Sequence, residues 1–127
     1  MKIKLSSVLV DNQAKALRFY TEVLGFEKKQ DFPVGDYKWL TGVSPEELDG
    51  TELLLEPNDN PSARTFQKAL FEQGIPQTAF AVDDVRGEYE RLKELGVVFK
   101  GEPTEGPGPA AAVFEDTCGN LVQIYQA

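Results

Sequence analysis

The sequence of 127 residues contains no histidine, one cysteine and no long apolar run. Without histidine, the commonest metal ligand and general base of enzyme sites is missing. Cys118 cannot form an internal disulfide, which agrees with a reducing compartment, and we interpret it as a structural turn residue. No segment approaches the roughly 20 apolar residues that span a bilayer, and residues 1–7 lack the apolar core of a signal peptide. We therefore expect a cytoplasmic protein with no membrane partner.

Basic residues are also few, since 13 Lys and Arg face 21 Asp and Glu, giving a net charge of -8. Phosphate binding depends on clustered Lys and Arg, so we expect no nucleic acid partner. A neutral or cationic small molecule suits this charge better. The hydrophobic content of 41% and the charged content of 27% are ordinary for one compact, soluble domain of this length.

The first half of the chain predicts one helix and four strands. A strand over residues 3–10 places Ser6, Val8 and Val10 on one face and Leu5, Ser7 and Leu9 on the other. Apolar residues at helical spacing predict a helix from about 13 to 24, which starts after Asp11-Asn12 and stops at Gly25. Further strands are expected over 26–32, 37–43 and 51–56, so this half reads β-α-β-β-β.

The second half repeats this order after a polar connector. Ala63, Phe66 and Leu70 predict a short amphipathic helix that ends at Gly74. A strand over 77–82, a helix between Asp84 and Gly96, and strands over 97–100, 111–115 and 121–125 follow. We predict a single domain made of module one (1–57), a linker helix (58–74) and module two (75–127).

An internal repeat supports this division. Val10-Asp11-Asn12, a helix and Gly25 recur as Val82-Asp83-Asp84, a helix and Gly96, about seventy residues later. Two halves that share one structural plan predict the α+β class, with two tandem βαβββ modules.

The repeated motifs resemble the vicinal oxygen chelate superfamily, which contains glyoxalase I, extradiol dioxygenases, fosfomycin resistance enzymes and bleomycin resistance proteins. The resemblance is carried by residues 16–20 and 23–26 in the first module and by residues 80–84 and 116–120 in the second. It implies that each module curls its sheet, and that the curved mixed sheet forms an open cup.

Enzymes of that family carry metal ligands on the floor of the cup: a His in the first strand, a Glu in the fourth, a His opening the second module and a Glu in the last strand. Counting from the motifs, the matching positions and their same-face neighbours are occupied by Leu5, Leu54 between Glu52 and Glu56, Gln77, and Gln123. Neutral amides hold transition metals poorly, so we predict no catalytic metal and no cofactor. A set of Glu56, Gln77 and Gln123 stays open as an atypical metal site.

The residues expected to bind a ligand share the open faces of the sheets. Gln123 is the single amide in an otherwise apolar row. The resemblance implies that the first and last strands of the second module are neighbours, which places Gln77 on the same face as Gln123. The two amides either satisfy each other or the neighbouring backbone, or they hydrogen-bond a carbonyl or hydroxyl of a ligand. The aromatic residues Phe32, Tyr37 and Trp39 either form a ligand wall or belong to the core. The carboxylates Glu52 and Glu56 either act as acid and base or are solvated or paired. The full set is Leu5, Tyr37, Trp39, Glu52, Glu56, Gln77, Gln123 and Tyr125.

Three functions remain open at this point. The first is a metal-independent protein that binds a small organic molecule in the cup, in the manner of the bleomycin resistance proteins. The second is a glyoxalase-like lyase or dioxygenase with an atypical metal site, and the third is a non-catalytic interaction module. The resemblance also implies a homodimer, to which the apolar stripe of Phe66 and Leu70 in the linker helix would contribute.

Overall fold

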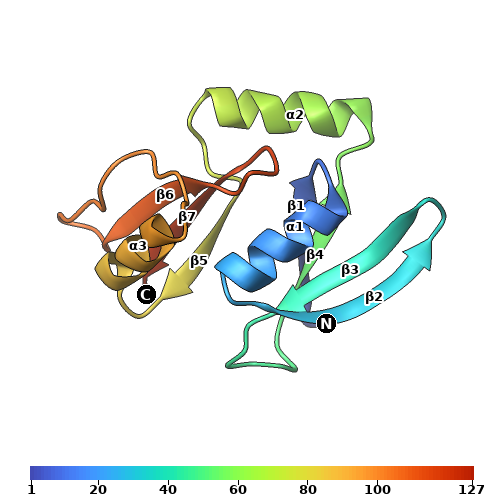
Figure 1. Cartoon of the computed structure of the whole chain (residues 1–127), viewed down its shortest axis with the longest axis horizontal. Coiled ribbons are helices and arrows are strands. Elements are labelled where there is room, and N and C mark those ends of the chain that lie inside the picture. Colours follow the sequence, from blue (N-terminus) through green and yellow to red (C-terminus); the bar gives the residue numbers. More distant parts are fainter. The chain divides into compact units, whose positions relative to one another are not determined.

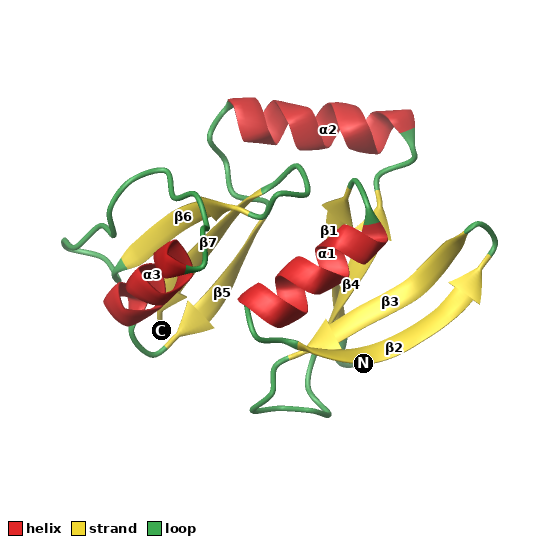
Figure 2. Cartoon of the chain, viewed as in Figure 1, coloured by secondary structure: helices red, strands yellow, loops and turns green.

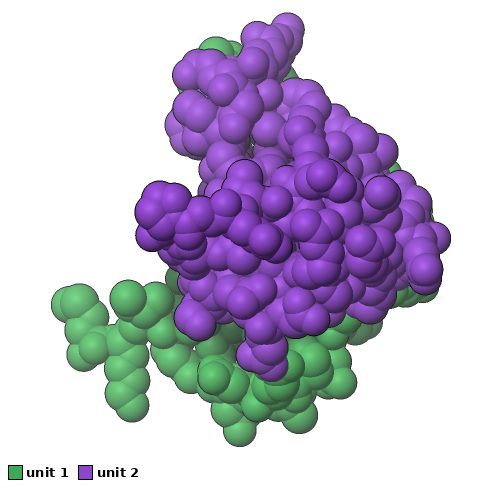
Figure 3. All heavy atoms as spheres, turned by 90° about the vertical axis from the view of Figure 1, so that its left-hand side faces the viewer, with its two compact units in different colours: residues 1–65 green, residues 66–127 purple.

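The computed structural model describes all 127 residues, coloured along the sequence in Figure 1. The chain divides into two compact units, residues 1–65 and 66–127, which Figure 3 distinguishes by colour. Helix α2 (Pro61–Glu72) crosses the boundary between them. No helix is long and apolar enough to cross a membrane. The predicted boundaries of the modules, at 57/58 and 74/75, stay a prediction.

The first unit is a four-stranded mixed sheet, sheet A, with α1 lying across one face (Figures 1 and 2). The strand order is β1-β4-β3-β2; β1 and β4 are parallel, and the other neighbouring pairs are antiparallel. Val8, Val10, Leu40 and Leu55 are buried. The elements are β1 (Leu5–Val10), α1 (Gln13–Arg18), a π-helical turn (Phe19–Val23), β2 (Glu27–Val34), β3 (Tyr37–Val43) and β4 (Glu52–Pro57).

Helix α1 begins as predicted but ends earlier than expected. Asn12 caps it, because its side chain accepts a hydrogen bond from the backbone N–H of Lys15 at 2.9 Å. The predicted helix over 13–24 is α-helical only to Arg18, after which the chain widens into the π-helical turn. The hydroxyl of Thr21 donates to the carbonyl of Leu17 at 2.6 Å, a contact of the kind that bends helices.

The second unit is a three-stranded sheet, sheet B, covered on one face by α3 (Figure 2). Its elements are β5 (Thr78–Val82), α3 (Val85–Glu94), β6 (Ala111–Glu115) and β7 (Leu121–Gln126), in the spatial order β5-β7-β6. The rings of Tyr89 and Phe99 lie 4.7 Å apart, and those of Phe99 and Phe114 lie 5.4 Å apart. This chain of rings joins α3 to the buried side of β6.

The predicted strand over 97–100 is wrong. Phe99 forms only an isolated bridge with Phe114, and the N–H of Lys100 donates to the carbonyl of Val113 at 2.8 Å. Gly101 follows immediately with a φ of 153°, a conformation that L side chains rarely adopt, so the ladder stops after one bridge. The α+β class is nevertheless confirmed, and the first unit has the predicted β-α-β-β-β order.

A buried polar network holds the turn that enters β7. Asp116 is fully buried; one carboxylate oxygen accepts from the N–H groups of Cys118 and Asn120, and the other accepts from the Asn120 side-chain amide. The amide of Gln67, in α2, donates to the Cys118 carbonyl at 3.1 Å and to the Asn120 side chain at 3.0 Å. Because Cys118 is completely buried inside this network, the structure supports its interpretation as a structural residue.

Candidate functional site

The face of sheet A opposite α1 carries the candidate residues of the first unit. Leu40 turns toward α1, so the alternation of β3 turns Trp39 and Thr41 to the other face. The parallel register pairs Leu5 with Glu52, and it places Glu52, Leu54 and Glu56 on one face, as predicted. The face opposite α1 therefore combines apolar, aromatic and acidic side chains: Leu5, Ser7, Leu9, Gln30, Phe32, Trp39, Thr41, Glu52, Leu54 and Glu56.

Aromatic rings are stacked on this face. Phe32 and Trp39 are direct partners in the β2–β3 pairing, and their rings lie 6.4 Å apart with an angle of 20° between the planes. Phe32 remains 46% exposed. Tyr37 lies two residues before Trp39 on β3, as expected for residues of one face, and it also borders a hollow next to α1. The pair of rings offers an aromatic surface against which a flat molecule can pack.

Glu52 is held in place by two hydrogen bonds. Its Oε1 accepts from the hydroxyl of Thr41 at 2.7 Å and from the side-chain amide of Gln30 at 2.6 Å. The hydrogen bonds from Thr41 and Gln30 lower the pKa of Glu52 below its ordinary value, although partial burial acts in the opposite sense. Glu52 is therefore an oriented anion at neutral pH.

Gln30 and Thr41 are site residues that the sequence did not reveal. The register between β2 and β3 shifts between Lys28 and Gln30, and this irregularity aligns Gln30 with Thr41. A bulge has no reliable signal in a single sequence. The Thr at position 41, near the centre of β3, was the one available hint, because a hydroxyl that becomes fully buried requires a partner.

The face of sheet B opposite α3 carries the two glutamines. Gln123 pairs with Ala79, and the N–H of Gln77 donates to the carbonyl of Leu121 at 2.8 Å, two residues before that pair. Both amides therefore lie on the predicted face. Ala79 and Ala81 are exposed, and Tyr125 pairs with Ala81 on the same face. This surface is small and apolar between its polar groups.

The two amides do not satisfy each other. The side-chain carbonyl oxygen of Gln77 is buried and has no hydrogen-bond partner. Burying such an acceptor without a partner costs about 1–3 kcal/mol. Gln77 and Gln123 therefore do not satisfy each other by hydrogen bonds, and the side-chain oxygen of Gln77 stays without a donor.

These residues do not fit a divalent metal. In sheet A the family's ligand positions hold Leu5 and Leu54, and one oxygen of the neighbouring Glu52 already accepts two hydrogen bonds. In sheet B the polar candidates are the neutral amides Gln77 and Gln123. No group of three or more histidine, cysteine, aspartate or glutamate side chains is placed to hold a metal ion. Divalent catalytic metals need anionic or imidazole ligands that converge.

Sequence comparison identifies a family and several relatives. A profile of the Glyoxalase/Bleomycin resistance protein/Dioxygenase superfamily matches residues 2–124. The uncharacterized protein YurT of Bacillus subtilis (strain 168) is 56% identical over 126 residues, which cover 99% of both chains. The uncharacterized protein YetH of the same organism is 33% identical over 121 residues, covering 94% of this chain and 93% of YetH.

Solved structures with the same architecture cover the whole chain. UcmS2 superposes with a TM-score of 0.85 at 30% identity, covering 100% of this chain and 98% of that one. TnmS3, described as an antibiotic binding protein from Streptomyces sp. CB03234, has a TM-score of 0.78 at 29% identity and covers 99% and 95% of the two chains.

Proposed function

The chain belongs to the Glyoxalase/Bleomycin resistance protein/Dioxygenase superfamily, and on that premise we propose that it binds a small organic molecule noncovalently, without a catalytic metal. The observation that carries the proposal is the face of sheet B on which the exposed Ala79 and Ala81 lie beside Gln123 and Gln77. A surface that is mostly apolar, with a few oriented polar groups, is typical of a small-molecule site.

The face of sheet A supports the same proposal with different chemistry. The stacked rings of Phe32 and Trp39 favour a planar or aromatic group. The anionic Glu52 favours a neutral or cationic ligand over an anionic one, in agreement with the net charge of -8. For this face we therefore propose a partly aromatic ligand that carries no negative charge.

A related protein gives this proposal a concrete direction. TnmS3, which is 29% identical to this chain, is described as an antibiotic binding protein. Antibiotic-like natural products are therefore the first class of compound to test on this chain. The proposed role is binding, as in a resistance or carrier protein.

The direct experiment is a thermal-shift screen of antibiotics and metabolites against the purified protein. A compound that binds only the native state raises the melting temperature in proportion to the logarithm of its concentration. We expect Gln77→Leu and Gln123→Leu to fold and to lower the affinity of the best compound by about tenfold or more. Affinity that is unchanged in both variants would remove the sheet B face from the proposal.

Metal analysis separates this function from a metal-dependent lyase or dioxygenase. We expect the protein to keep no stoichiometric nickel, zinc, iron or manganese after dialysis, and we expect ligand binding to survive a chelator. A bound metal that resists dialysis, together with an activity that is lost with chelator and restored by the metal, would favour the enzyme instead.

A further inference from the structure

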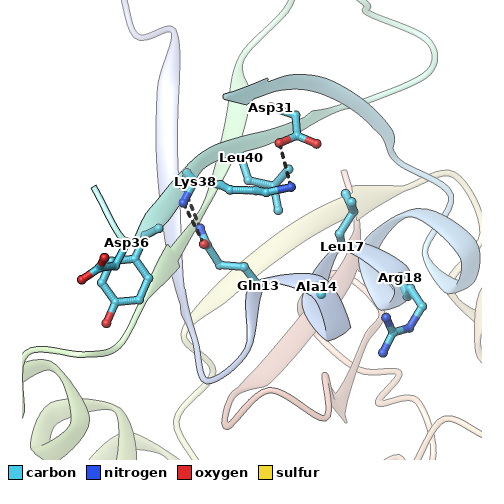
Figure 4. Close-up of a pocket in the computed structure, with 9 residues that line it drawn as sticks. Gln13, Ala14, Leu17, Arg18, Asp31, Asp36, Lys38 and Leu40 are labelled. Atoms are coloured by element: carbon cyan, nitrogen blue, oxygen red, sulfur yellow. Dashed lines mark hydrogen bonds and ion pairs between the residues drawn. The ribbon is translucent and has the colours of Figure 1, made fainter. Parts of the chain in front are cut away.

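A hollow lies in the first unit, on the α1 side of sheet A (Figure 4). Its volume is about 390 Å³, within the range of small-molecule sites. Leu40 lines it, whereas Trp39 points to the opposite face, so this hollow is separate from the surface proposed above. Its lining residues are Gln13, Ala14, Leu17, Arg18, Asp31, Asp36, Tyr37, Lys38 and Leu40.

The walls of the hollow are held in place without a ligand. The amide of Gln13 donates to the carbonyls of Lys38 at 2.8 Å and Leu55 at 2.9 Å, and its oxygen accepts from the N–H of Lys38 at 3.1 Å. These bonds fix α1 to β3 and β4. Figure 4 shows the Lys38 ammonium directed at Asp31, with which it forms an ion pair of 3.4 Å. A site that is formed in advance costs little ordering on binding.

The charges around the hollow leave one cation available. Lys38 is already paired with Asp31, which also binds Lys28 at 3.1 Å. Arg18 is exposed and forms no ion pair. Its guanidinium presents a planar set of donors that matches the two oxygens of a carboxylate. Because Asp31 and Asp36 also line the hollow, a ligand with several negative charges would be repelled.

Apolar side chains complete the lining. Leu17 lies one residue before Arg18 and is half-buried, and Leu40 is almost fully buried behind it. Ala14 leaves space one turn earlier on the same flank of α1. The π-helical turn begins directly after Arg18, and such turns occur often at functional sites. An apolar body and a single anionic group therefore match this lining.

We propose that this hollow binds a small organic monocarboxylate, with its carboxylate on the guanidinium of Arg18 and its apolar body against Ala14 and Leu17. This second ligand differs in charge from the one proposed for the opposite face of the sheet. The two proposals can therefore fail independently of each other.

The test uses benzoate as the probe and two-dimensional ¹H–¹⁵N NMR of the full chain. Benzoate at up to about 20 mM is expected to shift the backbone signals of residues 13–18 and 38–40, with a Kd of roughly millimolar size. Benzamide, which has the same shape without the charge, is expected to bind at least about tenfold more weakly.

Three substitutions on α1 provide the matched comparison. We expect Arg18→Gln to weaken benzoate binding by about tenfold or more, and Arg18→Lys to weaken it less, because a lysine keeps the charge and loses the planar fork. Lys15→Gln removes a positive charge from the same helix at a residue that does not line the hollow. The affinity of this variant for benzoate should stay within about twofold of wild type. The dispersion of each spectrum reports whether the variant is folded.

Each contrary result overturns the inference. These results are an absence of shifts at residues 13–18, equal binding of benzoate by Arg18→Gln and wild type, or equal binding of benzamide and benzoate. Shifts confined to the indole of Trp39 and its neighbours would place benzoate on the other face of sheet A and would also remove this site.

Discussion

At the scale of single residues, Gln77 is proposed to bind a ligand, and its side chain lowers the stability of the free protein. Its buried oxygen has no partner, so replacing the amide by an apolar group of similar length should remove a penalty. We predict that Gln77→Met raises the free energy of unfolding by about 1 kcal/mol in the absence of ligand, as measured by urea denaturation.

Gln73→Met is the matched control, since Gln73 is exposed and its substitution should change stability by less than about 0.5 kcal/mol. A loss of more than about 1 kcal/mol in Gln77→Met would mean that the amide is needed by the fold.

Glu52 makes the stability of the protein depend on pH in the acid range. Hydrogen bonds from Thr41 and Gln30 lower its folded-state pKa below the ordinary value of 4.5. The stability that this shift contributes is therefore fully present above the ordinary pKa and is lost as the pH falls through the folded-state pKa. We predict that Thr41→Val raises the pKa of Glu52 toward the ordinary value, as followed by carboxyl carbon NMR.

The same substitution should reduce the difference in unfolding free energy between about pH 6 and about pH 3, and Glu52→Gln should reduce it further. Glu90→Gln serves as a control, because Glu90 is exposed and should leave this difference unchanged. A wild-type Glu52 that titrates at or above 4.5 would contradict the prediction.

At the scale of elements, helix α1, which follows β1, and helix α3, which follows β5, both begin with an N-cap side chain. Asn12 caps α1, and the carboxylate of Asp84 accepts from the N–H of Gly87 at 3.1 Å at the start of α3. An acidic cap also interacts favourably with the helix dipole. We predict that Asp84→Ala lowers the free energy of unfolding by about 1 kcal/mol in thermal or urea unfolding.

The neighbouring Asp83 offers a close control for this prediction. Asp83 is exposed and caps nothing, so Asp83→Ala should stay within about 0.5 kcal/mol of wild type. Equal losses in the two variants would show that charge, and not capping, stabilises α3.

At the scale of the whole molecule, we predict a homodimer. Phe66 of α2 remains 53% exposed, and a large exposed apolar side chain on an amphipathic helix is typical of a contact surface. Light scattering should give twice the chain mass of 14.1 kDa, and Phe66→Glu should lower that value.

Lys68→Gln, on an exposed position of the same helix, should leave the mass unchanged. A wild-type mass of a single chain at micromolar concentration would contradict the predicted homodimer.

The sequence by itself determined the class of fold and the faces of the strands. The alternation in β4 was sufficient to place Glu52 with Glu56, because the side-chain period of a strand is two whatever its neighbours are. Placing Gln77 with Gln123 also required the strand neighbours that the family resemblance implied. The caps at Asn12 and Asp84 were equally local, since a cap depends on a few consecutive residues.

Only the tertiary structure decided which side chains meet. The contact of Gln30 and Thr41 with Glu52 depends on a bulge and on three strands, and the early end of α1 depends on a turn that the apolar spacing does not distinguish from a helix. The predicted strand over 97–100 does not form because only Phe99 pairs with a neighbouring strand, in a single bridge. These hydrogen bonds and buried contacts join distant parts of the chain. They depend on tertiary packing and not on local preference, and for this reason the sequence alone did not predict them.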